Sequence, residues 1–316
     1  MPILDVCVVG EINLDLILYG LPKDLILDRE LLASGLALTL GSSSAICAHN
    51  LAMLGSKVGF ISKIGSDPLG KMALERLSAA GVEVGRVKQA TGRTATGLTV
   101  ILPYLQQRYI LTYPGTMFEM QYSDIDMAYV RSARHLHVSS FFLHRALRPR
   151  ILELFRQAKA AGLSTSLDTN DDPENKWDRD LLDVLKHVDI FFPNDREAKK
   201  AARTDDLSQA INVLAGLAKT VVVKRGASAA ICRSGQEQYS LMPPTVKTVD
   251  DVGAGDSFAA GFIHQFLTGA KLEDCLAYAN VVGAYSTTKE GGTEAFRDHP
   301  SLTNFIRQHW SGTSRT

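Results

Sequence analysis

The stretch Thr248–Phe262, "TVDDVGAGDSFAAGF", places three small residues directly before an aspartate and an apolar run. The run predicts a helix, and the small residues Gly253–Gly255 would leave the amides at its start free to face a ligand. Unpaired amides and the helix dipole attract an anion. Asp256, in the first turn, would then act beside that anion, or it would simply cap the helix after a glycine turn. No Gly-Lys-[Ser/Thr] follows, so this is not a Walker A loop.

A weak base next to an anion pocket suits phosphoryl transfer. The transition state is loose, so the attacking hydroxyl loses its proton late and an ionised aspartate suffices. A divalent cation must then offset the repulsion between carboxylate and phosphate. The segment "FFPNDREAKK" offers Asn194 and Glu197 at the start of a predicted helix, and such oxygen ligands suit Mg²⁺ through water. The same N-x-x-E spacing is also that of a helix capping box.

Composition narrows the class of protein. The chain has 316 residues, 45% apolar, with Lys plus Arg equal to Asp plus Glu at 34 each. That balance gives no electrostatic footprint for nucleic acid or an anionic membrane. The four cysteines are scattered without a C-x-x-C pair, which favours a reducing compartment. With no signal peptide and no apolar run of membrane-spanning length, we expect a cytoplasmic protein.

The order of the expected elements indicates an α/β fold. A buried strand, "ILDVCVVG", opens the chain, and short strands at about 11–40 and 94–115 predict a small separate sheet. From about residue 133, strands and helices alternate, with a strand at 135–142, helices at 148–162 and 207–219, and a hairpin around 233–236. Such alternation predicts a mainly parallel sheet with helices on both faces. Ligands then bind at the carboxyl ends of the strands.

Two further segments fall at that edge. Asn13 and Asp15 are two apart in an extended segment and face the same way, so they could bind paired hydroxyls. Gly41, followed by three serines, opens a helix and could also meet a sugar. At another strand end, "VVVKRGAS" presents Lys224 before Gly226, where the backbone could approach a ligand. Each segment could also be an ordinary solvated turn.

Taken together and in this order, these motifs resemble the PfkB (ribokinase-like) carbohydrate kinases. "VDDVGAGDSFAAGF" is similar to that family's D-T-x-G-A-G-D-x-F signature, and "NDRE" to its N-x-x-E motif. "KIGSDPLGKMALERLSAAGV" and "TGRTATGLTVIL" resemble the segment after its first helix and a block of its lid strands. The resemblance implies one domain over residues 1–316, with a three-layer Rossmann-like core and a β-sheet lid that often forms a homodimer.

The resemblance also implies ATP as donor, Mg²⁺ as helper, and a role for each matched residue. Asp256 would be the general base on the acceptor hydroxyl. The anion hole would be formed by the backbone amides of Gly253, Ala254, Gly255 and Asp256, and the water shell of Mg²⁺ would be held by Asn194 and Glu197. The nucleotide would lie along Asn194, Lys224, Gly226 and Asn280, and the acceptor along Asn13, Asp15, Gly41 and Ser42. A monovalent cation such as K⁺ would bind Asp250.

The chain departs from the family pattern at several positions. Ser42 replaces the second glycine of a Gly-Gly pair, Ile46 replaces an asparagine that contacts the substrate, and Ala229 replaces a glycine of the nucleotide loop. Asp251 stands for the first threonine of the signature and adds a negative charge. Ser43 stands where the phosphosugar kinases carry a lysine, which disfavours acceptors of the phosphofructokinase type.

We therefore predict an ATP-dependent kinase that phosphorylates a hydroxyl of a small-molecule sugar. Two alternatives stay open. A nucleoside kinase would explain Ile46 by a partly apolar acceptor, and a catalytically silent relative would bind a sugar or a partner protein. A nicotinamide dehydrogenase is disfavoured because no G-x-G-x-x-G follows the first strand.

The remaining polar residues allow weaker interpretations. His135 and His137 share one strand face without a third ligand at useful spacing, so we expect structural or surface roles. Asp168 and Asn170 end a strand at the predicted site edge, where they line the site or form a turn. Arg108, between the two later lid strands, could touch a substrate carboxylate or phosphate, but we expect a solvated hairpin charge.

Overall fold

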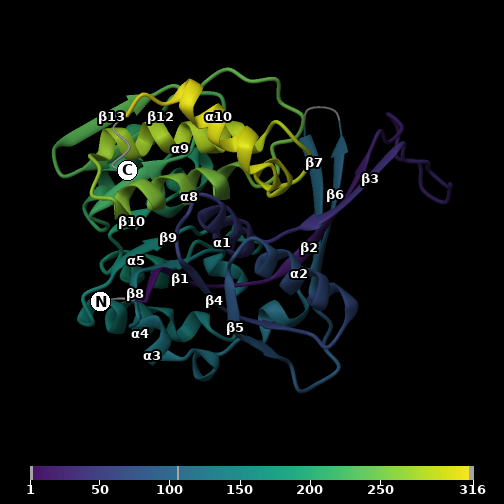
Figure 1. Ribbon diagram of the computed structural model, residues 1–316, viewed down its shortest axis with the longest axis horizontal. Helices are drawn as coiled ribbons and strands as arrows, with labels where there is room; N and C mark the ends of the chain where they lie inside the picture. The colour runs from purple at the N-terminus through teal and green to yellow at the C-terminus, as the bar shows by residue number, and fades with distance from the viewer. Residues whose placement is uncertain (1–2, 105–106, 313–316) are drawn as a thin grey trace.

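A nine-stranded, mostly parallel sheet forms the centre of the computed structural model, which describes residues 3–104 and 107–312 (Figure 1). Its strand order is β13-β12-β11-β10-β9-β8-β1-β4-β5, and among the described strands of this sheet the β11–β12 and β12–β13 pairs are antiparallel. The strands are β1 (Leu4–Val9), β4 (Val58–Ile64), β5 (Glu83–Gln89), β8 (Ala133–Val138), β9 (Ser164–Leu167), β10 (Ile190–Phe191), β11 (Thr220–Val223), β12 (Ala230–Ser234) and β13 (Glu237–Leu241).

Helices cover both faces of this sheet, as the alternation of elements predicts. One face carries α1 (Ser43–Met53), α2 (Pro68–Ala79), α8 (Ala254–Leu267) and α9 (Leu272–Ser286), with α10 (His299–His309) packed outside α9. The other carries α3 (Met127–Val130), α4 (Arg148–Ala160), α5 (Arg179–Leu185), α6 (Asp195–Ala202) and α7 (Leu207–Ala215). The short 3₁₀ turns are η1 (Gly115–Phe118), η2 (Tyr122–Asp124), η3 (Phe141–Leu143) and η4 (Glu294–Arg297).

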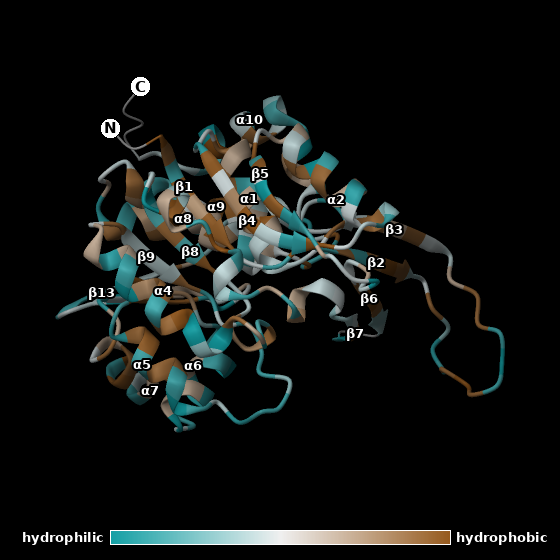
Figure 2. Cartoon of the chain, turned by 90° about the horizontal axis from the view of Figure 1, so that it is seen from below, coloured by the Kyte–Doolittle hydropathy of each residue, from teal (hydrophilic) through white to brown (hydrophobic). Residues whose placement is uncertain are grey.

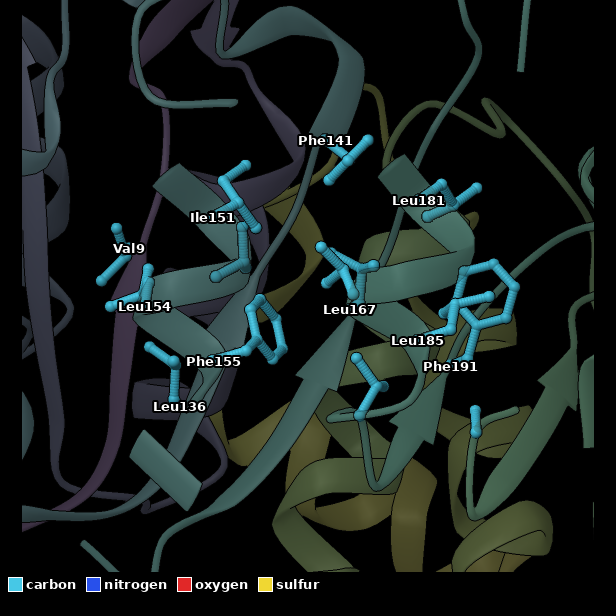
Figure 3. Packing of buried hydrophobic residues seen from close by; sticks show 14 of the residues in the cluster. Val9, Leu136, Phe141, Ile151, Leu154, Phe155, Leu167, Leu181, Leu185 and Phe191 are labelled. Carbon is cyan, nitrogen blue, oxygen red and sulfur yellow. The ribbon is translucent and has the colours of Figure 1, made fainter. Parts of the chain in front are cut away.

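The first strand shows why two separate cores form. Successive side chains of a strand point to opposite faces, so Cys7 and Val9 join the core under α4 and α5, whereas Val6 and Val8 join the core under α1 and α8. Figure 3 shows the first of these cores, where side chains of α4 and α5 pack on the strands around Leu167. A strand segment buried on both faces must be apolar, which explains the continuous apolar run Val6–Val9 in β1.

A second sheet of four strands stands beside this core. Its order is β3-β2-β6-β7, built from β2 (Asn13–Tyr19), β3 (Gly35–Leu40), β6 (Gly97–Tyr104) and β7 (Gln107–Tyr113). Figure 1 shows it at one end of the molecule, and Figure 2 shows the loop between β2 and β3 extending away from it. Leu27 in that loop is 88% exposed. The predicted lid is thus a separate sheet; residues 105–106, where the sequence predicts a turn between two strands, lie outside the described residues.

The structure confirms the α/β class and most predicted elements, and it corrects the ends of two. The strand expected over 135–142 ends at Val138, because Ser140 adopts a left-handed conformation and η3 follows. The helix expected over 207–219 ends at Ala215. The strands β4 and β5 and the helices α9 and α10 are further elements that the sequence patterns above do not predict. That 1–316 form a single domain stays a prediction, and residues 1–2 and 313–316 lie outside the described part.

The two histidines of β8 are structural, and a surface role for them is wrong. His135 bonds Ser164 and Ser166 at 2.7 Å each, and His137 bonds Ser166 at 2.7 Å and Ser139 at 2.8 Å. Burial lowers the pKa of both imidazoles to about 3, so they are neutral. The polar face of β8 is thus satisfied inside the protein by serine hydroxyls from the neighbouring strand and from the residue after β8.

Candidate active site

Helix α8 begins in the way that the opening stretch predicts. Gly253 has φ 72°, and a Cβ there would lie 2.5 Å from the Cα of Gly292, so only glycine fits without strain. No side-chain cap is found at this helix start within the described residues. The Ala254 amide donates to the Asp251 carbonyl at 3.2 Å. The first-turn amides that follow, including those of Gly255 and Asp256, lack an intrahelical acceptor and can meet an anion.

Asp256 lies partly buried in this first turn. Burial, followed by the nearby charge of Asp168, raises its pKa to about 7. The Lys224 ammonium and a hydrogen bond with Ser43 oppose that shift. Its carboxylate is therefore a better proton acceptor than an ordinary aspartate, which is what a general base near neutral pH requires.

The side chains of Asn13 and Asp15, both in β2, lie next to Gly41 in the turn before α1. Asn13 donates from Nδ2 to Thr99 at 2.7 Å, and its buried Oδ1 has no partner among the described residues. A Cβ on Gly41 would lie 2.2 Å from Asp15 Oδ1 and 2.9 Å from Asn13 Oδ1. Burial and the charge of Asp256 raise the pKa of Asp15 to about 7. Three of the predicted acceptor residues, Asn13, Asp15 and Gly41, thus lie together, near enough to the predicted base for its charge to act on Asp15.

The departures at the start of α1 have local explanations. Ser42 has φ 64°, the region that glycine adopts freely. Its hydroxyl donates to the Glu11 carbonyl at 2.6 Å and accepts from the Ala45 amide at 3.1 Å, so the side chain caps α1. Ile46 is buried against the backbone of Gly253 and Gly292. Packing alone therefore accounts for Ile46, and it gives no reason to expect an apolar acceptor.

A buried carboxylate beneath this cluster escaped the sequence analysis. Glu11 accepts from the hydroxyls of Ser44 and Ser140 at 2.6 Å each, and His144 Nε2 lies 3.3 Å away. Burial would raise its pKa, but His144 and the serines outweigh burial and lower it to about 2. Asn170 donates to Ser140 at 2.8 Å. The one available signal was a charged residue within the apolar run "VVGEINL".

Asn170 also joins Glu11's cluster to the base. It donates to Ser43 at 2.5 Å, and the Ser43 hydroxyl in turn lowers the pKa of Asp256. Asp168 and Asn170 therefore line the site, one of the two interpretations that the sequence left open.

A cavity of about 430 Å³ lies on the other side of the α8 start. Ala254, Gly255, Lys224 and Asn280 line it together with the 242–248 segment. Gly226, at its rim, has φ 56°. Asn280 donates to the Leu241 carbonyl at 2.9 Å and so fixes one wall. The predicted nucleotide residues Lys224, Gly226 and Asn280 share this cavity.

Asn194 and Glu197 form the capping box that was their alternative interpretation. The backbone N–H of Glu197 donates to Asn194 Oδ1, and the backbone N–H of Asn194 donates to Glu197 Oε2, both at 2.9 Å. Burial raises the pKa of Glu197 to about 7, with Lys224 opposing and Asp168 adding to the shift. Capping and a role in holding metal-bound water are compatible, because each carboxylate oxygen keeps a second lone pair. The metal role stays a prediction.

The lid reaches the opening stretch through two polar contacts. Tyr19 donates to Asp250 at 2.8 Å, and that carboxylate also accepts from the amides of Val252 and Gly291 at 2.9 and 3.1 Å. Arg108 forms an ion pair with Asp251, and both side chains stay exposed to water, so the expected solvated hairpin charge is confirmed. The pairing itself is tertiary, because it joins β7 to the loop before α8, which the sequence order does not reveal.

Comparison with known proteins shows the family of this chain. The sequence model of the family described as pfkB family carbohydrate kinase matches residues 4–298. An uncharacterized sugar kinase of Archaeoglobus fulgidus is 30% identical over 77% of this chain and 96% of its own length. An ATP-dependent ribose-1-phosphate kinase of Halopiger xanaduensis is 32% identical over 81% of this chain and 82% of its own.

A solved structure shares the fold over almost the entire length. The E. coli protein described as ribokinase II, in complex with ATP and Mg²⁺, superposes with a TM-score of 0.84 and 25% identity over 97% of this chain and 100% of its own. Fold, site and sequence match define an enzyme of the kinase class. The chain belongs to the pfkB family of carbohydrate kinases. Among the described residues, no helix combines the length and apolarity needed to cross a bilayer.

Proposed function

We propose that this chain transfers the terminal phosphoryl group of ATP to a hydroxyl of a sugar, with Asp256 as general base. The observation that carries the proposal is the position of Asp256. It lies at an uncapped helix start, with the Asn13–Asp15–Gly41 cluster on one side and the 430 Å³ cavity on the other. A raised pKa suits it to take a proton near neutral pH.

In the proposed reaction the acceptor oxygen forms a bond to the γ-phosphorus while the bond from that phosphorus to the bridging oxygen of ADP breaks. The acceptor proton passes to the Asp256 carboxylate. The first-turn amides of α8 donate to the phosphoryl oxygens as charge develops there. The lid would exclude water that could otherwise accept the phosphoryl group.

The residues present fit a nucleotide accompanied by Mg²⁺. Three carboxylates, Asp168, Glu197 and Asp256, surround the single Lys224 ammonium, so the site carries excess negative charge before any phosphate arrives. A divalent cation would offset that excess and the charge of the phosphates. Asn194 and Glu197 would hold its water ligands.

Substitution of the base tests the proposal. Asp256→Asn should lower kcat by ~10²–10⁴ on the true acceptor, measured as ATP consumption. The panel comprises ribose, ribose 1-phosphate, fructose, 2-keto-3-deoxygluconate, adenosine, inosine and cytidine. Asp274→Asn, at the first turn of α9, is a matched control that should retain activity. Near-normal turnover of the Asp256 variant would refute the assignment.

The same panel separates the sugar kinase from its alternatives. Selective turnover of the nucleosides would identify a nucleoside kinase. ATP binding without phosphoryl transfer to any acceptor would favour a catalytically silent relative.

We also propose that the lid forms a homodimer. Leu36, Ile110 and Leu111 are each more than half exposed on the lid, and Tyr109 and Tyr113 add to this apolar surface. A monomer gains nothing from exposing these side chains to water. Light scattering should give twice the chain mass for the wild type and the single mass for Ile110→Asp; a monomeric wild type at micromolar concentration would refute the dimer.

Asp250 is the proposed ligand of a monovalent cation. Three donors already orient its carboxylate at the joint between the lid and the α8 loop. Activity in K⁺ that exceeds activity in a choline salt of equal ionic strength would support this assignment, and equal rates would contradict it.

A further inference from the structure

Lys224 is a buried ammonium at the carboxyl edge of the sheet. It directly follows β11, and its amide donates to the Pro193 carbonyl at 2.9 Å. Its side chain is 12% exposed, and Nζ lies 2.5 Å from Asp168 Oδ2. Burial alone would lower the pKa of Lys224, but Asp168, Glu197 and Asp256 outweigh burial and raise it. Lys224 is therefore a permanent positive charge.

This charge lies next to the predicted anion hole. A Cβ built on Gly255 would be 3.4 Å from Lys224 Nζ, and both residues line the 430 Å³ cavity. Asp168 is the one side-chain acceptor that the described residues give this ammonium. An ammonium has three donors, so two N–H groups are left for a ligand beside the first turn of α8.

We propose that Lys224 donates to the terminal phosphoryl group of the nucleotide and stabilises it during transfer, with Asp168 as the residue that positions Lys224. This inference rests on the proposed phosphoryl transfer and gives Lys224 a role in the chemistry beyond lining the nucleotide cavity. Lys224 keeps its protons throughout, because the acceptor proton goes to Asp256 and the bonding electrons of the broken P–O bond stay on ADP. Its contribution is charge and direction alone.

A purely structural ion pair would explain the pair less well. Burying two ions carries a large desolvation cost, and an apolar pair of similar volume is often equally stable. Here the ammonium is adjacent to an open cavity and to glycine backbone on the wall where phosphate is expected. A structural pair has no need of that position.

Nucleotide affinity tests the inference without relying on an acceptor. Lys224→Met should weaken binding of the non-hydrolysable ATP analogue AMP-PNP by ~10–10²-fold, measured by calorimetry with Mg²⁺, and change the affinity for ADP by less than about threefold. In turnover, kcat should fall by ~10²–10³. Lys224→Arg should recover part of the AMP-PNP affinity, because it restores the charge.

Two further variants keep the test decisive. Lys224→Met leaves Asp168 buried without a partner, so the double variant Lys224→Met/Asp168→Asn removes both charges and guards against misfolding. Lys159→Met breaks the Lys159–Asp189 pair at 2.8 Å, outside the cavity, and should leave both affinities unchanged.

The outcomes are separable from those of the proposed function. A double variant that is folded, binds ADP normally and has lost affinity for AMP-PNP supports the inference, even if no sugar in the panel is phosphorylated. Equal losses for ADP and AMP-PNP, or no loss for either, overturn it, even if the wild type proves to be a sugar kinase.

Discussion

Gly41→Ala tests whether the acceptor site is built as the structure indicates. The added Cβ would lie 2.2 Å from Asp15 Oδ1 and 2.9 Å from Asn13 Oδ1, distances at which real atoms must move. Asp15 is enclosed by its neighbours and has little room to shift. Overpacking of this kind costs ~1–3 kcal/mol. If acceptor binding bears that cost, kcat/KM for the acceptor should fall by ~10–10²-fold, since a tenfold change corresponds to about 1.4 kcal/mol.

The assay is steady-state kinetics with the acceptor that the panel identifies. The acceptor concentration is varied at saturating ATP, and the ATP concentration is then varied at saturating acceptor. The KM for ATP should stay within about twofold of the wild-type value, because the nucleotide cavity is lined by other residues. Gly85→Ala is the matched control: a Cβ there meets nothing within 4 Å. A Gly41→Ala enzyme with wild-type kcat/KM for its acceptor would refute this placement of Asn13 and Asp15.

Three further predictions follow from the buried polar groups. As the pH falls below about 7, kcat/KM should drop about tenfold per pH unit, because Asp256, whose pKa is raised to about 7, then carries the proton it must accept; a flat profile from pH 5.5 to 8 would contradict its role. The pKa of Glu11 is lowered from 4.5 to about 2, so its stabilisation is present above pH 4.5 and is lost as the pH falls towards 2. Glu11→Gln should therefore lower the free energy of unfolding at pH 7 by about 3 kcal/mol, and urea denaturation that gives equal values for variant and wild type would exclude this. Ser166→Ala removes the hydroxyl between His135 and His137. It should lower the free energy of unfolding by ~1–3 kcal/mol in the same assay, with kcat unchanged. A loss of activity in a stable variant would show that these hydrogen-bonded histidines serve the reaction.

The fold class could be predicted from the sequence because the patterns that indicate it are short and local. The apolar run of β1, the alternation of strands and helices after residue 133, and the glycine before α8 each depend on neighbours within a few residues. The same holds for the helix start at Asn194, where cap and acid are three residues apart. Motif order then added the family, which the match over residues 4–298 establishes.

Tertiary structure alone decided which polar groups meet. The Lys224–Asp168 pair spans 56 positions and the Arg108–Asp251 pair spans 143, and no periodicity in a single chain encodes such pairings. The burial that raises the pKa of Asp256 likewise comes from elements distant in sequence. Local sequence was enough to predict most of the elements and the chemical types at their ends. The folded sheet decided which of those ends share one site, because parallel strands bring their carboxyl ends to a common edge whatever their separation along the chain.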